Sequence, residues 1–161
     1  MSYAVDTNVS VEKTRAEIES LLQKRGATRT AFGTEPGRAV IMFVINNIGV
    51  RFDLPLPDKS DKQFKLSRRY GHPRSSEAAF RAWEQTCRSL WRSLFLCIKA
   101  KLEACDAKIT TFEAEFLAHI VTPDGRTFGQ MAIPQITAMR ESGRQPQLQI
   151  GWNSDQEKTY P

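Results

Sequence analysis

The sequence has few of the residues that build metal sites and disulfide frameworks. Among 161 residues there are three cysteines and two histidines, and the cysteines stand at positions 87, 97 and 105. An odd number of cysteines cannot form a closed set of intrachain disulfides, and their spacing lacks the C-x-x-C pairs of structural zinc sites. We therefore expect reduced thiols, as in a cytosolic protein, with no metal site and no cofactor.

Long apolar runs and catalytic motifs are missing as well. The best apolar run, residues 94–98, is far too short to span a bilayer, and the opening segment MSYAVDTNVS lacks the basic and apolar regions of a secretory signal. The sequence contains no G-x-G-x-x-G, P-loop or G-x-S-x-G motif. These absences predict a cytoplasmic protein without membrane contact, and they give no catalytic residue to assign.

What the sequence does have is a local concentration of positive charge. Residues 59–101 hold eleven basic residues against three acidic ones, whereas the rest of the chain holds twelve basic and fifteen acidic residues. The net charge of +5 therefore arises from one segment. Such a concentrated field indicates a polyanionic partner rather than general solubility.

The first 56 residues predict a helix followed by a three-stranded antiparallel meander. Ser10 is a suitable N-cap, apolar residues then recur at helical spacing, and Gly26 ends the helix. Three strands are expected at residues 28–34, 38–45 and 50–56, separated by the turn sequences EPG and NNIG. The middle strand is apolar on both pleat faces, so we expect it to be central and covered on both sides.

Residues 57–76, PDKSDKQFKLSRRYGHPRSS, show no sustained period and predict a long loop. Loops of this length are usually functional or disordered. Cations interleaved with aromatic rings suit a flexible segment that orders on nucleic acid, with cations on phosphates and rings stacked on bases. The alternative is a solvated linker with its two rings packed on the core. The candidate contacts are Lys59, Lys62, Lys65, Arg68, Arg69 and Arg74, with Phe64 and Tyr70 as the stacking rings.

The longest helix is predicted for residues 76–108, and three stripes run along it. The apolar stripe should lie across the sheet as core and contains Phe80, Trp83, Cys87, Leu90, Trp91, Leu94, Ile98, Leu102 and Cys105. The basic stripe contains Arg81, Arg88, Arg92 and Lys99. With only Glu84 nearby as an acidic partner, it predicts a basic ridge, and the alternative is a solvated charged face. The stripe of small residues, Ser89, Ser93 and Ala100, would allow a homodimer through this helix.

The remaining residues predict shorter elements. A capping box at residues 110–113 starts a short helix, the sequence TPDG at 122–125 is a tight turn, and the apolar stretch 128–139 is interrupted by Pro134. The polar tail carries Leu148, Ile150 and Trp152 in alternation, as an edge strand would. We expect one α+β domain over residues 1–142, with the basic loop 57–76 within it, and a C-terminal tail over 143–161.

Two groups of carboxylates give weak catalytic signals. Glu115 and His119 are four residues apart on a helix, which is typical of an acid/base or second-shell pair, but a surface contact explains the spacing better. Asp53, Asp58 and Asp61 flank the third strand and are similar to the acidic sets that hold magnesium in nucleases. Such groups are common around strand ends, so we assign no catalytic residue.

Four blocks of the sequence, VEKTRAEIESLL, VRFDLPLPD, RSLWRSLFLCIKAKLEA and TTFEAEFLAHIVTPDGRTFGQ, resemble a family of small proteins carried by tailed phages and prophages of proteobacteria. The resemblance covers about residues 9–136. It implies a phage-borne protein in the cytosol of a bacterial host, and it implies no activity and no site residues. In topology alone, the helix, meander and helix order also resembles double-stranded RNA-binding domains and the core of single-strand annealing recombinases.

Together these features predict a non-enzymatic nucleic-acid-binding protein that serves phage DNA recombination or replication. Its partner would be a single-stranded or duplex nucleic acid, held through backbone contacts. The alternative is a phage counter-defence protein, similar to anti-CRISPR proteins, whose basic segment binds a host immune complex. A magnesium-dependent nuclease is the weakest alternative.

Overall fold

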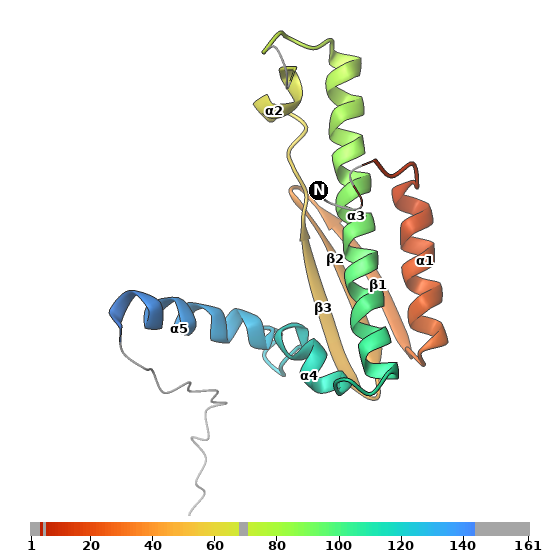
Figure 1. The fold of residues 1–161 in the computed structure, drawn as a ribbon, viewed down its shortest axis with the longest axis vertical. Helices are drawn as coiled ribbons and strands as arrows, with labels where there is room; N and C mark the ends of the chain where they lie inside the picture. The colour runs from red at the N-terminus through yellow and green to blue at the C-terminus, as the bar shows by residue number, and fades with distance from the viewer. Residues whose placement is uncertain (1–3, 5, 68–70, 144–161) are drawn as a thin grey trace, which may run out of the picture.

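The computed structural model describes residues 4, 6–67 and 71–143 (Figure 1). The elements follow in the order α1 (Val11–Lys24), β1 (Arg29–Glu35), β2 (Arg38–Ile45), β3 (Ile48–Pro55), α2 (Lys62–Lys65), α3 (Ser76–Asp106), α4 (Phe112–Phe116), the 3-10 helix η1 (Leu117–His119) and α5 (Phe128–Ser142). This order confirms the predicted α+β class, with a three-stranded sheet and one long helix.

Helix α1 begins and ends at the signals seen in the sequence. The side-chain oxygen of Ser10 accepts a hydrogen bond from the backbone N–H of Lys13 at 3.2 Å, which satisfies one of the N–H groups at the helix start. Gly26 follows the C-cap with φ of +83°, a conformation that glycine adopts without strain. The predicted N-cap and stop are therefore both confirmed.

The three strands form an antiparallel meander in the order β1-β2-β3. Gly37 has a φ of +78° in the turn between β1 and β2, and Asn46 and Asn47 have positive φ in the turn between β2 and β3. Paired positive φ values are characteristic of the two-residue hairpin turn that matches strand twist. Ile41 lies between Phe32 and Phe52, so these three residues share one face of the sheet.

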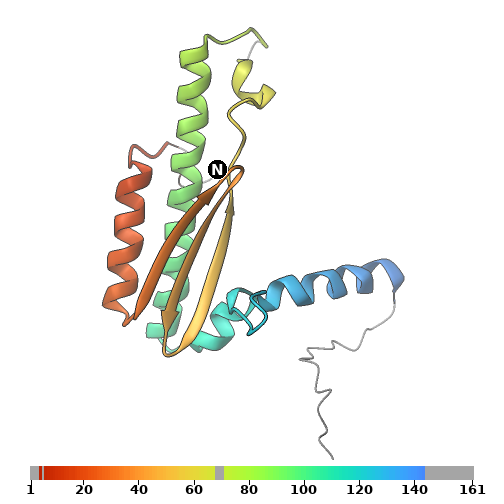
Figure 2. The same cartoon turned by 180° about the vertical axis from the view of Figure 1, so that it is seen from behind.

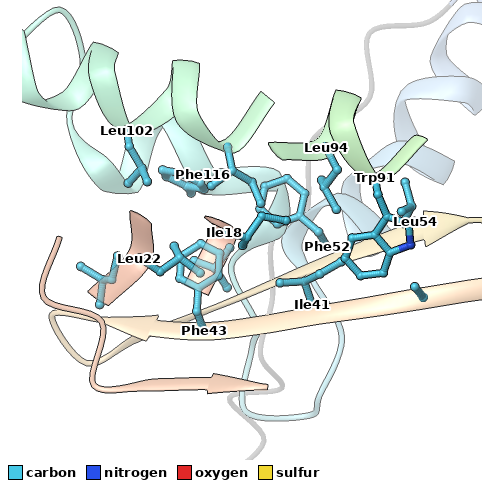
Figure 3. Packing of buried hydrophobic residues seen from close by; sticks show 14 residues of the cluster. Ile18, Leu22, Ile41, Phe43, Phe52, Leu54, Trp91, Leu94, Leu102 and Phe116 are labelled. Carbon is cyan, nitrogen blue, oxygen red and sulfur yellow. The ribbon is translucent and has the colours of Figure 1, made fainter. Parts of the chain in front are cut away.

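Helices α1 and α3 both cover the same face of the sheet, as the two opposite views show (Figures 1 and 2). Side chains from this face, from both helices and from α4 form one buried cluster (Figure 3). Each large apolar side chain that is fully buried stabilises the fold by about 1.5–3 kcal/mol. The labelled members are Ile18, Leu22, Ile41, Phe43, Phe52, Leu54, Trp91, Leu94, Leu102 and Phe116.

The opposite face of the sheet is open, which corrects the expectation that β2 is covered on both sides. Along β2 buried residues alternate with more exposed ones, and Met42 is 43% exposed although it lies on the central strand. Val40 and Val44 share this face and are only half-buried. The central position of β2 is confirmed, but its second apolar face has no covering element among the described residues.

The predicted apolar stripe of α3 is largely buried from Cys87 onward, but its first residue is exposed. Cys87, Trp91, Leu94, Ile98 and Leu102 are buried at the expected spacing. Phe80, in contrast, is 48% exposed, because the first turns of α3 extend beyond the end of the sheet (Figure 1). The helix ends at Asp106, two residues before the predicted end.

The segment 57–76 is more ordered than predicted. It contains the single turn α2, a bridge between Leu66 and Pro73, and a hydrogen bond from the Ser67 N–H to the His72 carbonyl at 2.8 Å. The described part is therefore a small folded unit docked on α3 rather than a flexible loop. Its sequence shows no period because the unit is built from turns.

The C-terminal part contains one helix where an interruption was expected. Helix α5 runs through Pro134, which lies inside it, so the expected break is wrong. Gly143 ends the helix with a φ of +64°. The predicted edge strand at residues 148–152 lies outside the described residues. None of the helices in the described ranges has the length and apolar character needed to cross a membrane.

Candidate nucleic-acid interface

Apart from Lys99, the described cations of residues 59–101 fall into two groups in the structure, and the first group is paired with acids. Arg81 pairs with Glu77 one turn earlier on α3. Lys101 donates from Nζ to Glu115 Oε1 at 2.9 Å and also to the Glu115 backbone carbonyl at 3.0 Å. Paired cations attract a phosphate more weakly, because the adjacent carboxylate cancels much of their field.

Two more arginines of α3 are paired and only partly exposed. Arg88 lies 3.2 Å from Glu84 and donates to Gln85 Oε1 at 2.7 Å. Arg92 pairs with Glu17 of α1, and its guanidinium lies 4.4 Å from the centroid of the Phe95 ring. These contacts fasten α1 to α3 and hold the Arg92 side chain near the protein surface.

The expected basic ridge of Arg81, Arg88, Arg92 and Lys99 is therefore largely neutralised. Its three arginines all have acidic partners, whereas the sequence indicated Glu84 alone. Among the described residues, only Lys99 of this set is exposed and free of an ion pair. The ridge is better described as an ion-paired surface of α3 than as a continuous phosphate-binding track.

The second group of cations comes from α2 and the residues before and after it in the chain, and it has no ion pair among the described residues. It consists of Lys59, Lys62, Lys65 and Arg74. The Lys59 ammonium lies 4.4 Å from the Trp83 ring centroid and 5.4 Å from that of Phe80, so its charge rests on aromatic faces. The Trp83 indole N–H donates to the Pro57 carbonyl at 2.8 Å, which fixes the ring beneath this lysine.

Arg74 is held close to α2 by the backbone. Its N–H donates to the Lys65 carbonyl at 2.7 Å, and its guanidinium lies 3.5 Å from the Phe64 carbonyl. Lys62 and Lys65 are both exposed on the turn itself. The positive field of Lys65 also contributes to lowering the pKa of the Asp58 carboxyl, although hydrogen bonds from Ser60 are the larger cause. We call Lys59, Lys62, Lys65 and Arg74 the α2 cation cluster.

A groove of about 680 Å³ runs between the α2 unit and α3. Its lining combines two members of the α2 cation cluster with neutral hydrogen-bonding side chains of α3, and Asp6 contributes an acid at one side. The cations of this lining suit a phosphate backbone, which offers only acceptors. The lining residues of interest are Lys62, Phe64, Arg74, Gln85, Thr86 and Ser89.

The structure corrects one of the two proposed stacking rings. Phe64 is only 4% exposed and packs inside the α2 unit, so its ring has no face available to a base. The alternative interpretation of the loop packed both rings on the core, whereas the buried Phe64 is not part of the sheet cluster. Arg68, Arg69 and Tyr70 lie outside the described residues, so their roles stay predictions.

The two weak catalytic signals do not form sites. His119 is stacked on Phe52, with ring centroids 3.9 Å apart, and Glu115 is bonded to Lys101 instead of to the imidazole. Burial lowers the pKa of His119, and the positive charge of Lys101 adds to this effect. Asp53 lies near Arg51 and Arg38 on the open sheet face.

The other two aspartates of the second signal also have separate surroundings. Asp58 accepts hydrogen bonds from Ser60, and Asp61 accepts from Gln63. Within residues 4, 6–67 and 71–143, no group of three or more histidine, cysteine, aspartate and glutamate side chains is placed to hold a metal ion. The three aspartates therefore do not converge on one point.

The three thiols are free within the described residues, and they differ in their surroundings. Cys87 is buried and Cys105 half-buried, and burial raises the pKa of both thiols. Cys97 is exposed. A raised pKa keeps a thiol protonated and unreactive, so Cys87 and Cys105 serve as apolar core residues.

Two acidic partners of the α3 arginines were not identified from the sequence, for different reasons. Glu77 stands four residues before Arg81, a spacing that could have been recognised as a helical ion pair. Glu17 stands 75 residues before Arg92, and no local signal connects the two.

Compared with protein-family models, with curated proteins and with solved structures, the chain matches none of them.

Proposed function

We propose that this protein binds nucleic acid through its phosphate backbone at the α2 cation cluster, without catalysing a reaction. One observation carries the proposal. The cations of the basic segment that have no acidic partner among the described residues gather around the α2 unit, apart from Lys99. Unpaired cations beside a polar groove offer the donors and the positive field that a polyanion needs.

The groove supports a single strand or a strand end as the ligand. Its volume of about 680 Å³ lies within the range of sites that enclose molecules of nucleotide size, about 300–1,000 Å³. Gln85, Thr86 and Ser89 line the α3 wall, and their donor groups are already bonded to backbone carbonyls of the chain. The donors for a phosphate therefore come from the cations of the groove. Lys62 and Arg74 lie across from them on the α2 side, so a strand in the groove would have cations along one wall.

We place this activity in phage DNA recombination or replication within the bacterial cytosol. The setting rests on the resemblance of four sequence blocks to proteins of tailed phages. The helix, meander and long helix order supports it as an analogy to nucleic-acid-binding domains of similar topology.

The direct test compares binding of single-stranded and duplex DNA and RNA by gel shift and fluorescence anisotropy across a salt series. The test variant is Lys62→Gln, Lys65→Gln and Arg74→Gln combined. We expect it to bind at least tenfold more weakly than the unaltered protein. Its slope of log K against log[salt] should be shallower by about 2, since each phosphate contact to a single strand contributes about −0.7.

The matched control removes the same number of charges elsewhere: Lys13→Gln, Lys24→Gln and Lys108→Gln. This variant should keep nearly full binding, because these residues lie outside the basic segment. Both variants should melt close to the unaltered protein, since the substituted lysines are exposed and the half-buried Arg74 makes one long side-chain hydrogen bond of 3.5 Å. Equal losses in the two variants would show a non-specific charge effect and would contradict the proposed site.

A counter-defence protein that binds a host immune complex is the second candidate. The specific observation in its favour is the pair of exposed apolar side chains near the cation cluster, Phe80 and Leu66. Exposed aromatic and aliphatic groups beside cations are typical of protein interfaces. If all four nucleic-acid probes stay free in the gel shift, the first proposal is wrong and this second function is favoured.

A further inference from the structure

Helix α5 leaves the body of the protein, and the described residues leave most of its surface uncovered (Figures 1 and 2). From Phe128 to Met139 its sequence, FGQMAIPQITAM, contains no charged residue. Ile133 is 60% exposed and Ile136 is 44% exposed. Three turns without a charge are typical of a helix that is buried on at least one side, so this exposure indicates a missing partner surface.

The apolar residues of α5 share one side of the helix. At 100° per residue, Phe128, Ala132, Ile136 and Met139 fall within a quarter turn, and Ile133 lies beside them. Next to this side, α5 and η1 form a small groove of about 170 Å³ with a nearly apolar lining. The helix therefore presents an apolar side with a shallow continuation onto η1.

The direction of α5 is set by contacts at its first turn. Thr127 and Gln130 form a capping box, and the same Gln130 side-chain oxygen accepts from Arg51 of β3 at 2.8 Å. A Cβ at Gly129 would lie 2.7 Å from the Ala118 carbonyl, so the helix packs tightly on η1. These contacts hold α5 pointing away from its own sheet, and bending back over that sheet would break them.

The open face of the sheet is another apolar surface that no described residue covers. Val40, Met42 and Val44 form a strip along β2. On β1 this strip is flanked by Gly33 and Ala31, which leave room for a helix to approach. The charged residues lie around the strip: Arg29, Glu35, Arg38, Arg51 and Asp53. An apolar centre with a charged rim is the usual composition of a protein interface.

We propose that the two surfaces meet in a homodimer in which α5 of each copy lies on the open sheet face of the other. A charge-free helix side matches an uncharged strip, and each chain carries both. A helix of 15 residues is about 22 Å long and about 10 Å wide. Two reciprocal contacts of this size remove on the order of 1,000 Å² from solvent, the area at which stable interfaces begin.

This interface replaces the one that the small-residue stripe of α3 predicted. Ser89 donates from Oγ to the Ala4 carbonyl at 2.6 Å, and Gln85 donates to the Thr7 carbonyl at 3.0 Å. Ala4 and Thr7 therefore lie against this part of α3, and Ala4 is itself buried. A second helix could pack at Ser89 only after these residues were displaced.

The test uses sedimentation equilibrium of the full chain between about 5 and 200 µM. The unaltered protein should sediment as a species of twice the 18.3 kDa chain mass. Ile136→Lys and Met42→Glu each place a charge in the proposed contact, and each should weaken the dimer at least tenfold. A mixture of the two variants should recover dimers, because one contact is then unaltered and the other joins Lys to Glu.

Ala138→Lys is the matched control, since position 138 lies on the opposite side of α5 from Ile136, and it should stay dimeric. Thermal melting shows that the variants are folded, because all three positions are exposed. A monomeric unaltered protein at 200 µM would overturn the proposal. Dimers that resist Met42→Glu would indicate pairing of α5 with α5, and a mixture that stays monomeric would exclude the reciprocal contact.

Discussion

The surfaces at the two ends of α3 differ in how many of their cations are paired with acids. Toward the C-terminal end, Arg92 and Lys101 are bonded to glutamates of α1 and α4, and the helix between them covers the sheet. Toward the N-terminal end, the helix extends beyond the sheet, and the α2 unit beside it carries cations without ion pairs. A charge count along the sequence treats both ends alike, although the described cations without ion pairs lie at the N-terminal end, apart from Lys99.

The difference shows that packing decides which cations are available to a ligand. Where an element with acids lies against α3, an arginine fastens two helices and loses much of its external field. Where the neighbouring unit carries mainly lysines, as α2 does, the charges stay exposed to solvent. Changes at each end should therefore separate stability from binding.

The largest expected effect is on stability, from Phe116→Ala near the C-terminal end of α3. Phe116 is fully buried and touches the rings of Phe43, Phe52 and Phe112. Removing a buried phenyl ring usually lowers the free energy of unfolding by about 3–5 kcal/mol. Urea denaturation should show this loss. A loss below about 1 kcal/mol would mean that α4 is not part of the core.

Phe64→Ala should have a smaller effect on stability and a larger one on binding. The ring is buried within the α2 unit, away from the sheet core, so we expect a loss of about 1–2 kcal/mol. The unit holding Lys62 and Arg74 should then open locally. Faster hydrogen exchange at residues 62–67, with affinity for oligonucleotides reduced, would confirm this. Unchanged exchange there would show that the unit is held by its backbone bonds alone.

The ion pair between Glu17 and Arg92 should contribute still less to the free energy of unfolding. Both side chains are partly exposed, and such pairs are worth up to about 1 kcal/mol. A double-mutant cycle with Glu17→Gln and Arg92→Gln measures the coupling by urea denaturation. Arg92→Gln alone should leave oligonucleotide affinity within about twofold. If it weakens binding as strongly as Arg74→Gln does, the division between the two ends of α3 is wrong.

The smallest expected effect is a dependence of stability on pH through His119. Burial lowers the pKa of this side chain below its ordinary value of 6.5, so the folded state holds the imidazole neutral. The contribution of the neutral imidazole to the free energy of unfolding is complete above pH 6.5, and it is lost as the pH falls through the lower pKa of the folded state. Melting temperatures at pH 7.5, 6.5 and 5.5 should therefore decline more steeply for the unaltered protein than for His119→Phe, which keeps the contact with Phe52. Parallel declines would show that His119 is accessible to protons when folded.

Local patterns predicted much of the backbone. The Ser10 cap, the EPG and NNIG turns and the buried spacing from Cys87 to Leu102 all correspond to structure within one or two residues. Each of these signals acts between residues fewer than five apart. The exceptions, α2 and the continuation of α5 through Pro134, have no period or contradict a propensity, so tertiary contacts had to decide them.

The candidate site was predicted in part. The sequence located the positive segment, and Lys62, Lys65 and Arg74 do lie together around α2. It did not reveal that Phe64 is buried or that Arg92 is paired. Burial of a single aromatic ring in a short unit depends on whether α3 extends far enough to cover it, and the spacing of residues in segment 57–76 carries no information about that.

The sequence by itself determined the α+β order of elements, the central position of β2 and the charge of the segment 59–101, because these follow from propensity, periodicity and composition. Only the tertiary structure decided which face of the sheet is covered, which cations are neutralised and where α5 points. The physical reason is that these properties depend on partners far away along the chain, such as Glu17 for Arg92 and Arg51 for Gln130.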